Sequence, residues 1–247
     1  MDSLGDRMKC FENANRTYLT RKVPVLCRCD GQAFHTYTRG LDKPFDQDLI
    51  DMMATAALNT AMSMHGCEAA YVQSDEVTFL LCDFQDIKTE PFFDYNVQKL
   101  VSTSAALMTA HFIREVMLSR GTKFSSKTPT PTFDSRVFNI PKEDTLNAIL
   151  WRMKDWERNS LFMYAAAFFS HKELMHKNKE AKHEMLHEIG KNWTTDLPAQ
   201  QRNGTFFVKL RTEDGCGWEK RCDILPNYTS ISEAFKELPN PCLNCLE

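Results

Sequence analysis

The sequence predicts an α+β fold, in which an antiparallel sheet of the ferredoxin-like β-α-β-β-α-β type carries helices on one face. Three observations predict it. Apolar segments follow one another in that order, two longer segments repeat apolar residues every three or four positions, and two short apolar runs are separated by only four polar residues. A mainly helical C-terminal extension should pack against the sheet.

The first strand is expected at Val23 to Cys29, an apolar run that stops at Asp30 and Gly31. A helix from about Asp46 to Met64 follows, because its apolar residues recur at helical spacing. Either Asp46 or Asp48 can cap its N-terminus.

The next two strands should form a hairpin. Glu68 to Val72 and Val77 to Cys82 are apolar, and the polar residues 73–76 between them suit a tight turn. An apolar helix from about Phe92 to Ser119 and a strand from Phe133 to Ile140 complete the sheet unit.

The remaining chain is expected to be mainly helical. Residues 143–190 carry an apolar stripe, and short strands are expected at Thr205 to Leu210 and around Trp218 to Cys222. We therefore expect a palm-like sheet domain over 1–140 and a helical part over 141–247, packed together as one compact unit.

Composition excludes several classes of protein. The chain has 247 residues, 43% of them hydrophobic, and no apolar run long enough to span a bilayer. The 30 Lys and Arg residues against 33 Asp and Glu give a net charge of −3, which argues against a polybasic coat but allows a local basic groove. The first ten residues lack the layout of a secretory signal, so we expect a cytoplasmic protein whose nine cysteines are reduced.

Three acidic residues mark the ends of the predicted strands. Asp30 ends the first strand, and Asp75 and Glu76 lie in the hairpin turn. The first strand should lie beside the hairpin, so the acids can converge and would repel each other unless a cation joins them. Oxygen ligands without nearby His or Cys favour Mg²⁺, in the two-metal arrangement used for phosphoryl or nucleotidyl transfer. The alternative is that both segments are ordinary solvated turns.

The sequence around these acids resembles that of the tRNA-His guanylyltransferase family, the reverse (3′-to-5′) nucleotide polymerases. The R-x-D-G-x-x-F-H, K-P-x-D and Q-S-D-E signatures of the family occur in order at Arg28–His35, Lys43–Asp46 and Gln73–Glu76. Similar F-D-x-R and W-R-x-x-D motifs occur at Phe133–Arg136 and Trp151–Asp155. The resemblance covers about residues 5 to 225, and its strength lies in the joint match.

The resemblance implies a polymerase-palm catalytic domain in which Asp30, Asp75 and the Gly31 carbonyl hold two Mg²⁺ ions and Glu76 supports the site. The residues it places around the activating nucleotide are Phe34, His35, Lys43 and Asp46. The residues it places on the triphosphate are Ser74 and Lys99. The tRNA contacts it implies are Arg136, Asn159 and Arg158, although Arg158 can equally be an exposed helix charge.

The chemistry of the family has two steps. ATP first adenylylates the 5′ monophosphate of tRNA and releases pyrophosphate. The 3′-hydroxyl of an incoming nucleoside triphosphate, usually GTP, then attacks that phosphate and expels AMP. The protein contributes positioning and charge neutralisation. Members of the family associate as tetramers, so a homotetramer is expected here.

Two departures from the eukaryotic pattern bear on the substrate. Glu157 to Ser160 stands where eukaryotic members carry H-I-N-N, and Asn96 stands where they carry arginine. This is typical of the bacterial and archaeal guanylyltransferase-like branch. We therefore favour templated repair of truncated tRNA 5′ ends over the addition of a single G to tRNA-His.

Other interpretations remain open. A nucleotide cyclase uses a similar palm, and a non-catalytic tRNA-binding protein could retain it as a scaffold. His183 to His187 satisfies the H-E-x-x-H zinc motif, but a solvated helix face explains it better. Cys242 and Cys245, with Cys216 and Cys222, could form a zinc site, although free thiols are the simpler interpretation.

Overall fold

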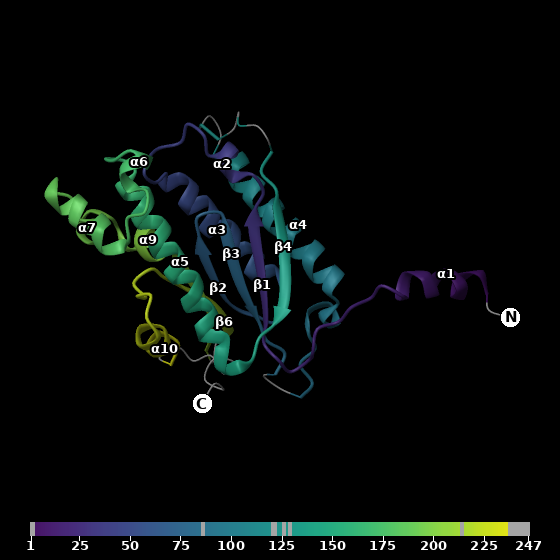
Figure 1. Cartoon of the computed structure of the whole chain (residues 1–247). Helices are drawn as coiled ribbons and strands as arrows, with labels where there is room; N and C mark the ends of the chain where they lie inside the picture. The colour runs from purple at the N-terminus through teal and green to yellow at the C-terminus, as the bar shows by residue number, and fades with distance from the viewer. Residues whose placement is uncertain are drawn as a thin grey trace.

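The computed structural model describes residues 3–84, 87–119, 123–124, 127, 130–212 and 215–236. Its centre is a six-stranded antiparallel sheet with the strand order β4-β1-β3-β2-β5-β6 (Figure 1). The strands are β1 Val25–Gly31, β2 Cys67–Gln73, β3 Glu76–Leu81, β4 Phe133–Asn139, β5 Thr205–Thr212 and β6 Gly215–Arg221. The predicted order of the first four strands and their two helices is confirmed.

The two predicted helices, α3 (Gln47–Ser63) and α4 (Val97–Leu118), cover one face of the sheet. Side chains alternate across a strand, so Val25, Cys27 and Cys29 of β1 are buried beneath these helices. Leu26, Arg28 and Asp30 point to the opposite face by the same alternation. Asp30, at the end of β1, therefore lies on the face of the sheet that α3 and α4 do not cover.

The opposite face is covered in part by α5 (Thr145–Ala165) and α10 (Tyr228–Lys236). Leu26 and Leu80 of the sheet pack there with Ile149 and Met153 of α5 in a second buried cluster. The helices of the C-terminal part therefore complete a layer that the first four strands alone would leave exposed.

The predicted helix from Phe92 does not run uninterrupted. The 3₁₀ segment η1 (Phe92–Tyr95) precedes α4, and Phe93, Asp94 and Tyr95 all have positive φ, from 51° to 56°. Asn96 then caps α4 by accepting a hydrogen bond from the Lys99 N–H at 3.0 Å. The periodic apolar pattern extends across this break, so it could not reveal where the helix begins.

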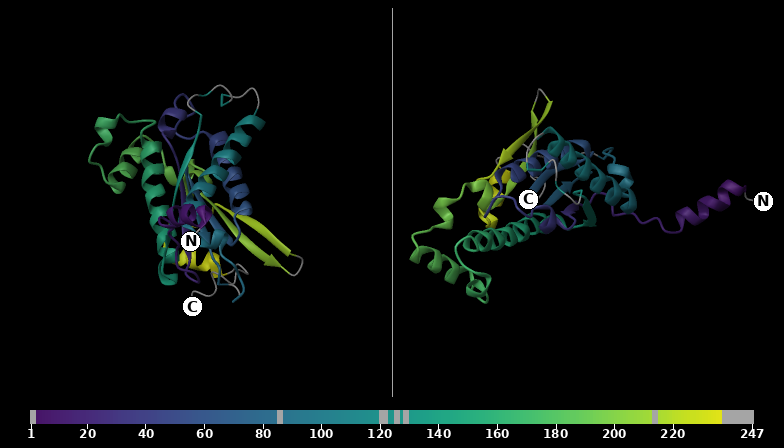
Figure 2. Two further views of the ribbon diagram at one scale, coloured as in Figure 1. Left: turned by 90° about the vertical axis from the view of Figure 1, so that its right-hand side faces the viewer. Right: turned by 90° about the horizontal axis from the view of Figure 1, so that it is seen from above.

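The two C-terminal strands occur where expected, and both extend the same sheet. β5 pairs antiparallel with β2, and β6 pairs with β5 in a long hairpin that projects from the helical layers (Figure 2). Phe206 and Val208 of β5 enter the cluster beneath α5. The C-terminal part is thus joined to the sheet by backbone hydrogen bonds as well as by packing.

Most of the remaining helices surround a third, smaller core. A small third core of Leu161, Leu174, Leu186 and Trp193 holds together the end of α5 and the short helices after it. Those helices are α6 His171–Leu174, α7 Lys179–Glu188, α8 Trp193–Asp196 and α9 Ala199–Asn203; α2 Phe34–Tyr37 and η2 Lys142–Asp144 lie nearer the sheet. The N-terminal helix α1 (Leu4–Asn13) buries none of its residues and lies away from the body of the protein (Figure 1). Among the described residues, no helix is both long and apolar enough to cross a membrane.

Candidate active site

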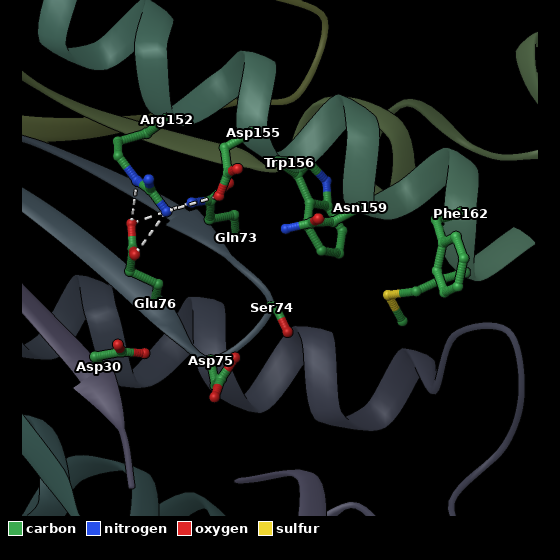
Figure 3. A pocket seen from close by; sticks show the side chains of 11 residues that line it. Asp30, Gln73, Ser74, Asp75, Glu76, Arg152, Asp155, Trp156, Asn159 and Phe162 are labelled. Carbon is green, nitrogen blue, oxygen red and sulfur yellow. Dashed lines mark hydrogen bonds and ion pairs between the residues drawn. The ribbon is translucent and has the colours of Figure 1, made fainter. Parts of the chain in front are cut away.

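The site is built where β1 ends beside the β2–β3 turn. The Gly31 N–H donates a hydrogen bond to the Asp75 carbonyl at 3.0 Å, and Asp30 pairs in register with Glu76. Ser74 adopts a left-handed conformation with φ of 49°, which closes the turn. Asp30, Ser74 and Asp75 line one cavity of about 310 Å³ at this edge (Figure 3). The predicted convergence of the acids therefore occurs.

The two aspartates have different environments. Burial raises the pKa of the Asp75 carboxyl, and the charges of Asp30 and Glu76 raise it further, against hydrogen bonds from its own backbone and Ser74. Asp30 is more open, with its side chain 42% exposed and its Oδ2 lying 3.8 Å from Arg136 Nη2. A partly buried carboxylate beside a second carboxylate is a site where a cation would be favourable.

Glu76 is directed away from this pair and towards α5. Arg152 donates to both of its oxygens, at 2.6 and 2.7 Å, and Gln73 donates to one of them at 3.1 Å (Figure 3). Both Glu76 and Arg152 are only 12% exposed. In the described part of the chain, no three His, Cys, Asp or Glu side chains are gathered as a metal site. Glu76 thus ties β3 to α5 through Arg152. Its predicted support of the metal site would be indirect, by holding these two elements in place.

Gly31 and Phe34 depend on each other. A Cβ at position 31 would lie 2.3 Å from the Phe34 ring, so only glycine fits beneath that ring. Phe34 is 3% exposed and packs against Tyr37, Phe112 and Phe133. Because the ring is almost entirely buried, the structure offers little surface for the predicted stacking of a base on it.

Two more cavities adjoin the acidic edge, and Ser74 lines both. The first, about 330 Å³, lies over Gly31 and Asp75 and includes the exposed His35. The second, about 290 Å³, is largely apolar and has Lys43 in its wall. Its apolar lining includes Leu41, Ile50, Trp156, Phe162 and Met163. These side chains were missed by the sequence interpretation, because no motif distinguishes them from ordinary core residues.

Asp46 is present in the apolar cavity wall, but its carboxylate is engaged by its own chain. It accepts hydrogen bonds from Leu49 N and Asp42 N at 3.2 and 3.1 Å and pairs with Lys123 Nζ at 2.5 Å. Burial alone would raise the pKa of Asp46, yet these donors outweigh burial and lower it. The expected helix cap is confirmed, while its direct contact with a nucleotide stays a prediction.

Lys99 is not brought to the site. It lies exposed on the first turn of α4, with Nζ 5.6 Å from the centre of the Phe93 ring. The opposite half of α4 approaches the acidic edge, where Phe112 contacts Phe34, and the rise of a helix puts Lys99 about 20 Å away from Phe112. The expectation that Lys99 grips a triphosphate at the site of its own chain is therefore not supported by this geometry.

The three predicted tRNA contacts lie on the rim of the site. Arg136 on β4 is held between Asp30 and Asp134, with Nη2 3.2 Å from Asp134 Oδ1. Asn159 lines the acidic cavity from α5 (Figure 3). Arg158 is 71% exposed and paired with Asp155, as an ordinary helix-surface charge would be. Contacts of all three with tRNA stay predictions.

The two possible zinc motifs do not form a site in the described residues. His183 packs edge-on against the Trp193 ring, and burial lowers its pKa, whereas His187 is exposed. Cys216 is exposed and Cys222 contacts Thr205, and both are free thiols. The predicted pair Cys242 and Cys245 lies outside the residues that the structure describes.

Comparison with known proteins gives a consistent picture. A family model described as tRNAHis guanylyltransferase matches residues 5–141. A probable tRNA(His) guanylyltransferase of Dictyostelium discoideum is 28% identical over 97% of both chains, and an uncharacterised mimivirus protein is 27% identical over 84% of this chain and 77% of its own.

Several solved structures are similar to this chain. A bacterial tRNA(His) guanylyltransferase-like protein in complex with ATP has a TM-score of 0.80 and 36% identity, covering 90% of this chain and 92% of its own. A bacterial protein of the same description in complex with GTP has a TM-score of 0.73 and 32% identity, with the same coverage. The Saccharomyces cerevisiae tRNA(His) guanylyltransferase, at 21% identity over 83% of this chain and 93% of its own, shares the fold with a TM-score of 0.72.

Proposed function

The chain belongs to the tRNAHis guanylyltransferase family and is a nucleotidyltransferase acting on tRNA, and from this premise we propose that it performs Mg²⁺-dependent, templated 3′-to-5′ addition of nucleotides to truncated tRNA 5′ ends. The observation that carries the proposal is the meeting of Asp30 and Asp75 in one cavity, beside the Gly31 backbone.

The residues present fit a pair of Mg²⁺ ions. Asp30, Asp75 and the Gly31 carbonyl offer hard oxygen donors, and the raised pKa of Asp75 reflects a burial and charge penalty that a bound cation would relieve. When bound, the metal would supply charge neutralisation for the attacking and leaving oxygens of a phosphoryl transfer. The Phe34 ring and the Gly31–Asp75 hydrogen bond would keep these donors in place.

The activating ATP would occupy the apolar cavity. Leu41, Ile50 and Phe162 give its walls an apolar surface for a base, and Lys43 stands in the same wall as a compact cation for phosphate. Ser74 lines all three cavities, so its hydroxyl could donate to a phosphate that runs from the apolar cavity towards the aspartates. The complexes of the bacterial relatives with ATP and with GTP support nucleoside triphosphates as ligands of this chain.

The chain's own residues would then hold and orient the reacting groups. Lys43 and Ser74 would position the triphosphate. Arg136, beside Asp30, and Asn159, in the wall of the acidic cavity, would receive the tRNA end. The 5′ phosphate would first take the adenylyl group from ATP with release of pyrophosphate. The 3′-hydroxyl of the incoming triphosphate would next attack that phosphate, and AMP would leave.

Repair of truncated ends is favoured over single G addition by the α5 surface. Glu157 to Ser160 replaces the eukaryotic H-I-N-N, and Ser160 is buried and donates to the Gln201 carbonyl at 2.9 Å. Of the four positions, Asn159 keeps the eukaryotic residue and is exposed, whereas the other three differ and Ser160 is turned into the protein. The higher identity to bacterial guanylyltransferase-like structures than to the yeast enzyme agrees with this preference.

The decisive experiment uses a 5′-labelled tRNA lacking its first nucleotide. Each of the four triphosphates is tested against each opposing base, with ATP and Mg²⁺ present. Repair predicts that only the complementary nucleotide is added efficiently. Addition of G regardless of the opposing base would instead establish identity marking of tRNA-His.

Two controls separate the remaining alternatives. Incubation with ATP, GTP and Mg²⁺ without RNA should give no cyclic nucleotide, and a cyclic product would favour a cyclase. Asp30→Ala should lose extension while still binding tRNA. If that variant extends tRNA normally, the proposed metal site is wrong.

A further inference from the structure

Trp151 is exposed on α5 in a way that packing does not explain. It is 56% exposed, whereas Trp156 and Trp193 are buried and Trp218 is partly buried. An indole ring is among the most costly side chains to leave in water. Such a ring, kept at the surface, suits contact with another molecule.

Two arginines hold the ring in place. The guanidinium carbon of Arg152 lies 4.7 Å from the ring centre and that of Arg28 lies 5.5 Å from it. Arg152 is itself fixed by both oxygens of Glu76 and by Asp155 (Figure 3). The ring is therefore pre-organised, and less conformational entropy would be lost when a partner binds it.

The ring lies close to the acidic site. Arg28 and Asp30 are two residues apart on β1 and share its open face, on the order of 7 Å along the strand. Arg136 pairs in register with Arg28, and Phe138, on the same face of β4, is 38% exposed. The exposed Trp151 and Arg136, with the largely buried Arg28 next to both, thus form a strip that reaches the rim of the cavity that contains Asp30.

This strip is better suited to a base than to a phosphate chain. Arg152 is neutralised by Glu76, and Arg136 is paired with Asp134 and Asp30. Arg28 Nε is buried and makes no hydrogen bond among the described residues, with Glu76 Oε2 3.9 Å away. Unpaired nucleotides are commonly recognised by aromatic rings and guanidinium planes of this kind.

We infer that Trp151, supported by Arg28 and Arg152, is a stacking platform for an unpaired base of the tRNA 3′ strand. The inference rests on the proposed chemistry at the tRNA 5′ end. In tRNA the 5′ end pairs with the 3′ strand, and that strand continues as unpaired nucleotides. A 5′ phosphate held at Asp30 therefore brings those nucleotides close to the strip.

The test is a double-mutant cycle on enzyme and RNA. The wild type, Trp151→Ala and Trp151→Phe are compared on one tRNA with its unpaired 3′ nucleotides and on the same tRNA without them. Both kcat/KM for extension and Kd for the tRNA are measured. Tyr18→Ala is the matched control, since Tyr18 is 49% exposed and its backbone pairs with Asn96 at the opposite end of the sheet.

Removal of the tail should cost the wild type about tenfold in kcat/KM and Kd, the size expected for one stacked base. Trp151→Ala should lose about tenfold on the intact tRNA and nothing further on the shortened one, and Trp151→Phe should keep most of the difference. Tyr18→Ala should behave as the wild type.

Equal losses for Trp151→Ala on both tRNAs would overturn the inference and make the ring purely structural, as would a wild type indifferent to the tail. If the cycle holds in Kd but the wild type extends neither tRNA, the stacking site stands and the proposed function fails.

Discussion

At the residue scale, the site depends on a few atoms held by backbone geometry. Gly31 must lack a Cβ because the Phe34 ring occupies that volume, and Ser74 takes a left-handed turn that directs Asp75 towards Asp30. Asp75 carries the energetic cost of this arrangement, since burial and two neighbouring acids raise its pKa. That cost makes its role testable by stability measurements as well as by activity.

Asp75→Asn should raise the free energy of unfolding of the metal-free protein at neutral pH. The folded state binds a proton at Asp75 more readily than the unfolded state, because the pKa of Asp75 is raised on folding. The contribution of Asp75 to the free energy of unfolding is therefore fully present below its pKa in the unfolded chain and is lost as the pH rises through its raised pKa in the folded protein. Urea denaturation against pH should show the gain at neutral pH shrinking towards acid. Asp48→Asn, at a 69% exposed side chain, should change stability by less than about 0.5 kcal/mol. A less stable Asp75→Asn at neutral pH would contradict the burial penalty.

With Mg²⁺ added, the wild type should become more stable than the Asp75→Asn variant. The wild type should gain melting temperature as Mg²⁺ is added, because a ligand that binds only the folded state stabilises it by mass action. Asp30→Asn and Asp75→Asn should each lose most of that gain, and a chelator should abolish it in the wild type. Thermal melts over a Mg²⁺ titration decide this, and an unchanged gain in both variants would place the metal elsewhere.

At the element scale, two contacts fix the helices that border the site. The Glu76–Arg152 pair joins β3 to α5, and Asp46 caps α3 beside the apolar cavity. Glu76 and Asp46 were predicted as functional positions, whereas Arg152 was only part of a motif, and the structure adds that each contact holds an element in place. Loss of either should therefore be visible in stability before any substrate is considered.

Arg152→Met should destabilise the protein by about 2–3 kcal/mol, because it leaves Glu76 buried with only Gln73 and a distant Arg28. The double variant with Glu76→Gln should recover most of this loss, since no charge is then left without its partner. Urea denaturation of the two single variants and the double variant measures the coupling. Additive losses would show that the pair is not a clamp.

Asp46→Ala should destabilise by about 1–2 kcal/mol, through the lost N-cap of α3 and the lost pair with Lys123. Asp48→Ala is the matched control, since it lies in the same first turn and does not cap the helix. Comparable losses in thermal or urea unfolding for the two variants would refute the capping role.

At the scale of the whole molecule, the sheet crosses the boundary expected near residue 140. β5 pairs with β2, and Phe206 and Val208 share a core with Ile149 and Met153. We propose that residues 1–140 and 141–247 form one cooperative unit. We expect this unit to assemble into a tetramer in which the tRNA lies across several chains.

A fragment of residues 1–140 should not fold cooperatively on its own. It would expose the edge of β2 and the apolar face that α5 and α10 cover in the full chain. The full chain should unfold in one transition seen alike by circular dichroism and tryptophan fluorescence. An independently folded fragment with its own sharp transition would show two separable units.

Much of the site was predictable because its residues form local signals. Asp30 lies at the end of a strand, and Asp75 lies in a turn between two short strands, so their convergence follows from topology alone. Lys99 shows the limit of that reasoning. Its place in the family pattern said nothing about which end of α4 faces the acids, and tertiary packing directed the opposite end there.

The sequence by itself determined the strand and helix order, the acidic edge and the family, because alternation, helical periodicity and turn residues act over a few neighbours. Only the tertiary structure decided that Glu76 is bound by Arg152, that Phe34 is buried, and that Trp151 stays exposed beside the site. Those outcomes depend on which side chains from distant segments compete for the same space and charge, and no local pattern records that competition.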